Sequence, residues 1–152
     1  KKRGIINSIY IDTETLAVHN DELQAMYKQV TANEQMWEEY NCENAEYIIT
    51  AFGTVARIAK SAINELKEKG IHVGLVRPIT VWPFPYDAVS KAVNQPSVKA
   101  VLDVELNEGQ MLEDVKLAVC GTKPIDFTGH CGSQMPTTDE IVEKILSMKE
   151  GK

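Results

Sequence analysis

The sequence predicts an α/β fold in which an open, mostly parallel sheet is covered by helices on both faces. Two observations lead to this prediction. Residues 45–85 read as one strand–helix–strand unit, which is the usual crossover between parallel strands. Short apolar runs then continue to alternate with helical stretches, with further strands expected at 98–104 and 124–127.

The spacing of apolar residues defines the strand–helix–strand unit. One apolar run at 48–52 stops at Gly53, and a second follows at 72–76. Between them, apolar residues recur three and four positions apart, which places them on one face of a helix. Thr54 is expected to cap this helix at its start and Gly70 to end it.

Three more helices are expected after this unit. They are predicted at 86–93, at 110–119 and after Thr137 or Thr138, one of which caps the last helix. Glu140 is placed to complete a capping box there.

The N-terminal part is expected to form a linker and a long docking helix at 1–44, ahead of an α/β domain at 45–152. Residues 5–11 are apolar enough for an edge strand, and the helix is predicted from about 14 to 40 with Asp12 or Thr13 as its cap. Its apolar stripe has a seven-residue spacing: Leu16, Leu23, Val30 and Trp37. Such a stripe fits a partner-binding or coiled-coil helix, or a helix that packs on its own sheet or on a neighbouring domain.

Composition excludes several functional classes. The net charge is −6 without a Lys/Arg cluster, which argues against nucleic acid and anionic membranes as partners. No apolar run approaches the roughly 20 residues of a membrane span. The three cysteines cannot all pair within one chain, which favours reduced thiols and a cytoplasmic location. Because the chain starts with Lys1-Lys2-Arg3, we expect it to be a piece of a longer polypeptide.

Several motifs carry a resemblance to a known family. They are AFGTVARIAKSA, GIHVGLVRPITVWPFP, DVELNEGQM and GSQMPTTDEIVEKI. Together they resemble the C-terminal domain of the α subunit of 2-oxoacid:ferredoxin oxidoreductases, most closely the branched-chain type that acts on 2-ketoisovalerate (3-methyl-2-oxobutanoate). Two stretches depart from the family pattern: a more polar strand end at 103–107, and 130–133, where a Gly-Gly pair is common.

The resemblance implies both a fold and an assembly. The fold is a three-layer α/β/α sandwich of the transketolase C-terminal-domain type, with an extra long N-terminal helix. The implied reaction is oxidative decarboxylation of a 2-oxoacid, such as pyruvate or its branched-chain analogues, to acyl-coenzyme A with ferredoxin as acceptor. Thiamine diphosphate, Mg²⁺ and iron–sulfur clusters are expected elsewhere in the complex. The implied partners are the preceding α-subunit domain, the other subunits and, indirectly, ferredoxin.

The candidate interface residues follow two of the predicted strands. Glu105, Asn107, Gly109 and Gln110 stand at the carboxyl end of a buried strand, where open α/β sheets place their ligand crevices. Glu105 could bond a facing loop and Gln110 could reach across an interface; alternatively, Asn107 holds its own turn and Glu105 satisfies nearby amides. Trp82 and Phe84 are the further candidates, in a proline-limited loop where Trp82 is expected to be buried.

Other possible chemistry has weaker support. Gly53-Thr54 at a helix start could hold a phosphate, but no second glycine follows. His130-Cys131 suggests a nucleophile and a base, but adjacent side chains point apart. The sequence also lacks the cysteine spacing of iron–sulfur sites. We therefore expect no catalytic, cofactor-binding or metal residue on this chain.

Two functions remain as hypotheses. The first is a structural and subunit-docking domain of such an oxidoreductase, inactive by itself. The second is a stand-alone small-molecule-binding α/β domain that uses the crevice near Gly53, Pro78 and Asn107.

Overall fold

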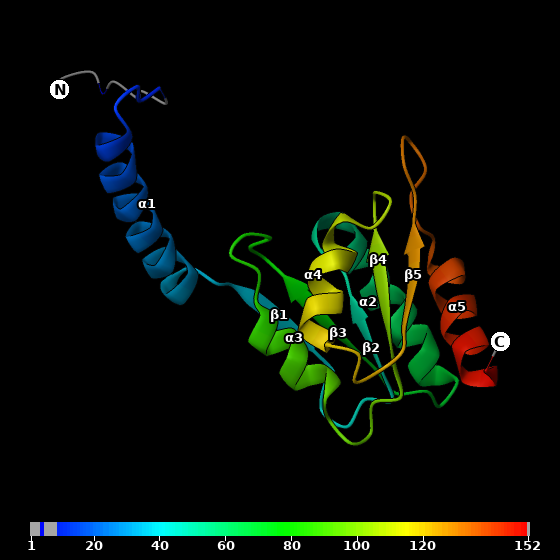
Figure 1. Ribbon diagram of the computed structural model, residues 1–152. Helices are drawn as coiled ribbons and strands as arrows, with labels where there is room; N and C mark the ends of the chain where they lie inside the picture. The colour runs from blue at the N-terminus through cyan, green and yellow to red at the C-terminus, as the bar shows by residue number, and fades with distance from the viewer. Residues whose placement is uncertain (1–3, 5–8, 152) are drawn as a thin grey trace. The chain divides into compact units, whose positions relative to one another are not determined.

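The computed structural model describes residue 4 and residues 9–151, which fall into two compact units, 1–34 and 35–152 (Figure 1). In the first unit, helix α1 (Thr13–Asn33) begins after Asp12, whose carboxylate accepts a hydrogen bond from the Thr15 N–H at 2.7 Å. Asp12 is therefore the cap, as one of the two predictions had it. The expected edge strand at 5–11 lies partly outside the described residues, and residues 9–11 are not in a strand.

The second unit is built on a five-stranded sheet within the described residues. Its strands are β1 (Trp37–Tyr40), β2 (Tyr47–Thr50), β3 (Val73–Pro78), β4 (Ala100–Glu105) and β5 (Ile125–Gly129). The order across the sheet is β1-β3-β2-β4-β5, with β1 antiparallel to β3 and the other neighbours parallel. The predicted, mostly parallel sheet is confirmed.

Strand β1 corrects the predicted extent of the N-terminal helix. The helix ends at Asn33 rather than near Tyr40, and the chain then pairs with β3. Glu38 of β1 forms ion pairs with Lys60 and Arg77. The seven-residue spacing of apolar residues predicted Trp37 on the helix. Contacts with residues far along the chain instead place Trp37 in a strand.

Helices cover both faces of the sheet, which confirms the three-layer sandwich (Figure 1). Helices α2 (Gly53–Glu68) and α5 (Thr138–Glu150) pack on one face, and α3 (Tyr86–Val93) and α4 (Gln110–Val119) on the other. Alternate strand residues face the two layers. Ile49 and Leu102 lie in the core under α2 and α5, whereas Ile48 and Val101 lie in the core under α3 and α4.

The helix ends agree with the sequence in two places and differ in one. Thr137 and Glu140 form the predicted capping box of α5. Gly70, just past the end of α2, has the left-handed φ of +75° that was expected of it. Thr54 does not cap α2, because the helix already begins at Gly53 and Phe52 takes the capping position without a side-chain bond.

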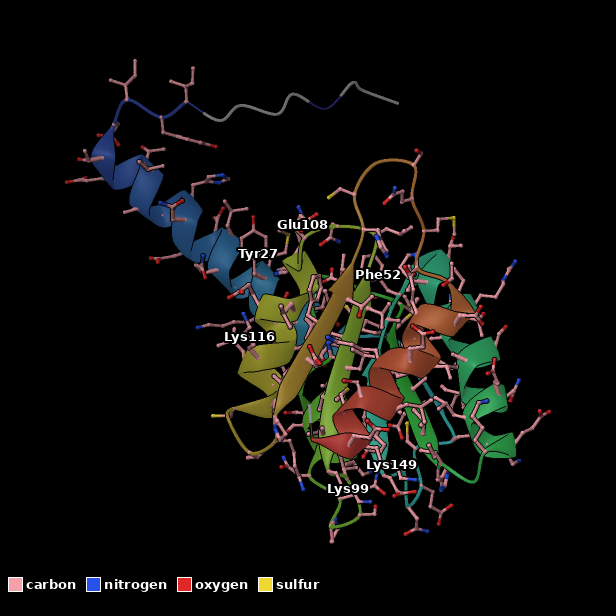
Figure 2. All side chains as sticks on the ribbon, turned by 90° about the vertical axis from the view of Figure 1, so that its right-hand side faces the viewer. Tyr27, Phe52, Lys99, Glu108, Lys116 and Lys149 are labelled. Atoms are coloured by element: carbon pink, nitrogen blue, oxygen red, sulfur yellow. The ribbon has the colours of Figure 1, made fainter. Side chains whose placement is uncertain are left out.

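The topology places a crevice between the carboxyl ends of β2 and β4. These strands are neighbours, but the chain leaves β2 for α2 on one face and leaves β4 for α4 on the other. Ligand and partner sites of open α/β sheets gather where the connections diverge in this way. Figure 2 shows Phe52 and Glu108 at this end of the unit, and Lys99 and Lys149 at the opposite end.

Candidate interface site

A cavity of about 350 Å³ opens at the carboxyl ends of the strands. Three connections line it: the one after β2, the one after β3, and the one from β4 into α4. The lining residues are Phe52, Val81, Phe84, Glu105, Gln110, Met111 and Asp114. This carboxyl-end cavity brings together three of the predicted interface residues, namely Glu105, Gln110 and Phe84, from two separate parts of the sequence.

Glu105 is bonded within the chain. It is only 1% exposed, and its carboxylate accepts hydrogen bonds from the backbone N–H groups of Met111 and Leu112, each at 2.9 Å. The Asn107 side-chain amide donates a third bond at 2.9 Å. These amides belong to the first turn of α4, which otherwise lacks partners for them. Of the two interpretations left open by the sequence, Glu105 follows the one in which it satisfies nearby amides.

Asn107 and Gly109 shape the turn before α4. The Asn107 Oδ1 accepts from the N–H groups of Gly109 and Gln110, both at 2.8 Å, which is the predicted self-bonded turn. Gly109 has a φ of +97°, a conformation that side chains with a Cβ rarely adopt. Gln110 is exposed at the start of the helix. Of the four candidate residues in this loop, Gln110 is thus the exposed one and available to a partner.

Asp103 is a buried carboxyl group beneath the same loop. It is fully buried, and its Oδ1 accepts a hydrogen bond from the Thr50 hydroxyl at 2.6 Å. Its Oδ2 has no donor among the described residues. Burial raises the pKa of Asp103 to about 8; the Thr50 bond opposes this rise, and the nearby Glu105 carboxyl group adds to it. The raised pKa favours the protonated form of Asp103 at neutral pH.

The aromatic loop is divided between core and surface. Trp82 is 59% exposed, so the prediction that it is buried is wrong. Phe84 is 3% exposed and packs in the core under α3 and α4, edge-on to Tyr86. The loop turns between them through a cis Trp82–Pro83 bond, and Thr80 donates to the Pro83 carbonyl at 3.0 Å. Of the exposed apolar residues in this loop, Val81 lines the cavity, and Trp82 follows it in the chain.

A basic hollow of about 260 Å³ lies at the start of α2, where the sequence suggested a phosphate. Arg57, Lys60 and Arg77 line it with Gly53, a grouping that the sequence did not reveal because Arg77 belongs to another strand. Both Lys60 and Arg77 are bonded to Glu38, so one carboxylate already offsets part of their charge. This leaves the phosphate hypothesis without a specific support.

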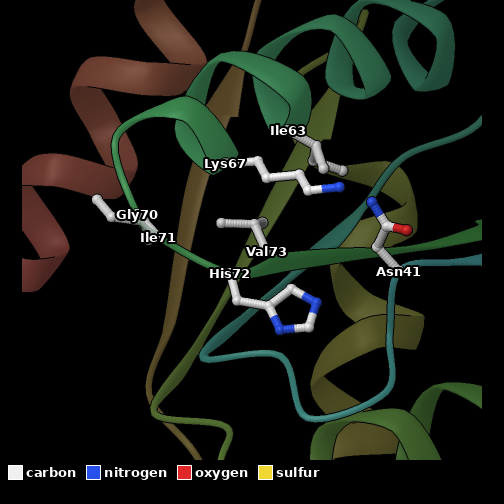
Figure 3. Close-up of a pocket in the computed structure, with 7 residues that line it drawn as sticks. All are labelled: Asn41, Ile63, Lys67, Gly70, Ile71, His72 and Val73. Atoms are coloured by element: carbon white, nitrogen blue, oxygen red, sulfur yellow. The ribbon is translucent and has the colours of Figure 1, made fainter.

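A further hollow lies at the amino end of β3 (Figure 3). Lys67 and His72 are its charged or titratable members, and Ile63, Ile71 and Val73 supply its apolar surface. It stands at the end of the strand opposite to the crevice, away from the predicted interface residues. Its lining has no convergent set of polar groups that would fix a ligand.

The His130–Cys131 pair does not form a nucleophile with its base. The His130 Nε2 lies 3.3 Å from the Glu140 carboxylate, and the Cys131 thiol is bonded to Glu108 instead. The Glu108 contact raises the pKa of the Cys131 thiol, which opposes formation of the reactive thiolate.

The described residues do not fit the cofactors that the resemblance implies for the complex. No three His, Cys, Asp or Glu side chains gather in a metal-binding group in this part of the chain. Cys42 is buried in the core, and burial raises its thiol pKa to about 11, whereas Cys120 and Cys131 are exposed. At the carboxyl-end cavity, the Glu105 oxygens are already bonded to amides. These donors suit neither Mg²⁺ with a diphosphate nor an iron–sulfur cluster.

Comparison with known proteins identifies the family of this chain. The family described as pyruvate:ferredoxin oxidoreductase core domain II matches residues 45–141. The chain belongs to this family. The same residues contain the sheet strands β2 to β5 and the carboxyl-end cavity, so the matched segment includes the candidate interface.

Relatives of this core domain II chain are oxidoreductase subunits. The ketoisovalerate oxidoreductase subunit VorB of Methanothermobacter thermautotrophicus is 33% identical over 94% of this chain. The 2-oxoglutarate synthase subunit KorA of Methanocaldococcus jannaschii is 31% identical over 72% of this chain. The chain spans 40% of the length of VorB and 29% of KorA.

Solved structures show the same fold. The 2-oxoglutarate:ferredoxin oxidoreductase of Magnetococcus marinus matches 91% of this chain and 24% of its own chain, with a TM-score of 0.74 and 18% identity. A split gene transketolase matches 67% of this chain and 37% of its own, with a TM-score of 0.56 and 16% identity. The transketolase-type architecture is thereby confirmed. In the described residues, no helix is long and apolar enough to cross a bilayer.

Proposed function

We propose that this chain is a structural and subunit-docking domain of a thiamine-diphosphate-dependent 2-oxoacid:ferredoxin oxidoreductase that acts in the cytoplasm on branched-chain 2-oxoacids. Family membership and the similarity to VorB support the enzyme class and the substrate preference. We assign no catalytic residue to the chain, because its described side chains do not fit the cofactors of that reaction.

The surface at the carboxyl ends of the strands is the observation that carries the docking role. There the exposed residues Val81 and Gln110 line a cavity, and exposed Trp82 follows Val81 in the same loop. Exposed apolar side chains next to polar ones are typical of a protein–protein contact. Trp82, Phe84, Glu105, Asn107, Gly109 and Gln110 are the residues of this proposed contact; Glu105, Asn107 and Gly109 act by holding the loop in shape.

Helix α1 is proposed as a second docking element. None of its residues is buried, and Leu16, Val18, Met26 and Tyr27 are among its exposed apolar side chains. A helix with this surface gains stability when a partner covers it. Because β1 belongs to the sheet, the predicted boundary at 44/45 moves to 34/35, and we propose the part before it as linker and docking helix.

Purification through an affinity tag on this chain tests the proposed function. The tagged chain is expressed in its own cells, and the purified material is assayed for ferredoxin reduction that depends on coenzyme A and 3-methyl-2-oxobutanoate. We expect activity in the co-purified complex, and neither activity nor thiamine diphosphate binding in the isolated chain. A stand-alone domain without oxidoreductase subunits would contradict the proposal and favour the small-molecule-binding alternative. Micromolar cofactor binding to the isolated chain, measured by calorimetry, would also contradict it.

A further inference from the structure

The carboxyl-end cavity differs in charge from the hollows at the start of α2 and beside β3. Its walls are apolar and partly aromatic, formed by Phe52, Val81, Phe84 and Met111. Its ionisable groups are two carboxyl groups, Glu105 and Asp114, and no Lys or Arg lines it among the described residues. The hollows at the start of α2 and beside β3 both contain basic side chains, so the acidic and apolar lining distinguishes the carboxyl-end cavity from these two.

Among the described residues, the hydrogen-bond donors to the two carboxyl groups are neutral. Backbone and side-chain amides bind Glu105, and the Tyr86 hydroxyl donates to Asp114. The bond to Asp114 is the main cause that raises the pKa of Tyr86 to about 12, so Tyr86 keeps its proton and remains the donor. Lys116 of α4 is paired with Glu113, outside the cavity lining.

We propose that the carboxyl-end cavity receives an arginine or lysine side chain from a partner polypeptide of the oxidoreductase. This inference rests on the proposed function. The methylene stem of such a residue would lie along Phe52, Val81 and Met111, as long basic side chains commonly do on apolar surfaces. Its cationic head would reach the carboxyl groups of Asp114 and Glu105, near aromatic rings that favour a cation.

Charge complementarity selects this occupant over others. An anionic group would face two carboxyl groups without a counter-ion in the lining, which is unfavourable in a partly enclosed site. A purely apolar side chain would cover the half-buried Asp114 and remove its access to water without supplying a donor. Val81 in the lining, together with exposed Trp82 next to it in the chain, would exclude water around the docked cation, as the surroundings of binding hot spots do.

A matched pair of charge reversals tests the proposal in the assembled enzyme. Asp114→Lys puts a competing cation into the cavity, whereas Glu113→Lys makes the same charge change at the neighbouring, exposed position outside it. The dissociation constant of each purified chain for the remaining oxidoreductase polypeptides is measured by sedimentation or calorimetry. We expect Asp114→Lys to weaken association about tenfold or more, and Asp114→Asn several-fold, because both remove a charge partner from a desolvated contact.

Glu113→Lys is the control for the charge reversal in the cavity. Glu113→Lys is expected to change the dissociation constant less than about twofold, as rim charges contribute little. Equal weakening by both reversals would indicate a general field effect and overturn the inference, and so would no weakening by either. If the Asp114→Lys chain associates as tightly as the wild type, the inference about the cavity is wrong but the proposed function still holds. If the wild-type chain associates with no oxidoreductase polypeptide, the proposed function itself is wrong. Thermal melts of each variant verify that it is folded before association is compared.

Discussion

Thr50 and Asp103 face each other across strands β2 and β4, and the Thr50 hydroxyl donates to the Asp103 carboxyl group at 2.6 Å. Two residues further along β4, the Glu105 carboxylate holds the first amides of α4. Hydrogen bonds of these two buried carboxyl groups thus link β2 to β4 and β4 to α4. The loop at the proposed interface is fixed from inside the domain, which leaves Gln110 free to meet a partner.

The first prediction concerns the pH dependence of stability through Asp103. Its pKa is about 8 in the folded chain, above its ordinary value of 3.8, so the unfolded chain releases the proton first as pH rises. The stability that Asp103 contributes is complete below pH 3.8 and is lost as pH rises through about 8. Asp103→Asn supplies a neutral group with the same donor and acceptor, so it should flatten this decline and stabilise the domain at alkaline pH.

Urea unfolding between pH 5 and pH 9 measures this effect, with Asp139→Asn as the control at an exposed position in the first turn of α5. As pH rises, we expect the free energy of unfolding of the Asp103→Asn protein to increase steadily relative to that of the wild type. The free energy of unfolding of the control should change with pH as that of the wild type does. If the difference between the Asp103→Asn protein and the wild type is the same at every pH, Asp103 is ionised in the folded chain.

The second prediction concerns Glu105 as the anchor of α4. Glu105→Ala leaves the Met111 and Leu112 amides without their acceptor, at about 1–3 kcal/mol for each buried group. We therefore expect the free energy of unfolding to fall by ~2–5 kcal/mol in denaturant melts. Glu108→Ala, in the same loop but exposed, should change it by less than ~0.5 kcal/mol. Similar losses in the two variants would refute the anchoring role.

The third prediction concerns the close packing of Gly129 under the loop. A Cβ added to Gly129 would lie 2.3 Å from the Asn107 carbonyl oxygen, so Gly129→Ala must displace the 105–110 loop. We expect a loss of ~1–3 kcal/mol in stability and altered amide NMR signals at residues 105–112. Ser133→Ala, in the exposed loop that follows, serves as the control. Unchanged signals in the Gly129→Ala protein would show that the loop does not depend on this contact.

The fourth prediction compares the two aromatic residues of the 82–85 loop. Phe84→Ala empties a core site and should cost ~3–5 kcal/mol of stability. Trp82→Ala changes an exposed residue and should cost the isolated domain less than ~1 kcal/mol. Denaturant melts of both variants, measured side by side, check the division. A larger loss for Trp82 than for Phe84 would reverse the assignment of core and interface.

Local sequence patterns predicted most of the sheet and helices but not the edge of the sheet. Strands β2 to β5 and helices α2 to α5 carry apolar periodicities that any packed sandwich requires, so they could be read from the chain. Strand β1 has only four residues, and its position depends on pairing with β3 and on the ion pairs of Glu38 with Lys60 and Arg77. Those partners are 22 and 39 residues away, beyond the reach of a local pattern.

The candidate site was predictable in position but not in detail. The loop after β4 was found from the polar residues at a strand end, and the structure places a cavity there. The burial of Phe84 in place of Trp82 is decided by the path of the loop around two prolines, which the composition does not specify. The contribution of Phe52 and Val81 to the same cavity requires the strand order, because they follow two other strands.

We propose that the Gln110 side chain serves association rather than folding. The most direct test is the dissociation constant of the Gln110→Ala chain for the other oxidoreductase polypeptides, with Lys149→Ala at the opposite end of the domain as control (Figure 2). We predict weaker association by ~1–3 kcal/mol for Gln110→Ala, and a loss below ~1 kcal/mol in the stability of the isolated domain. An isolated domain that unfolds readily while the complex assembles with unchanged affinity would contradict the claim.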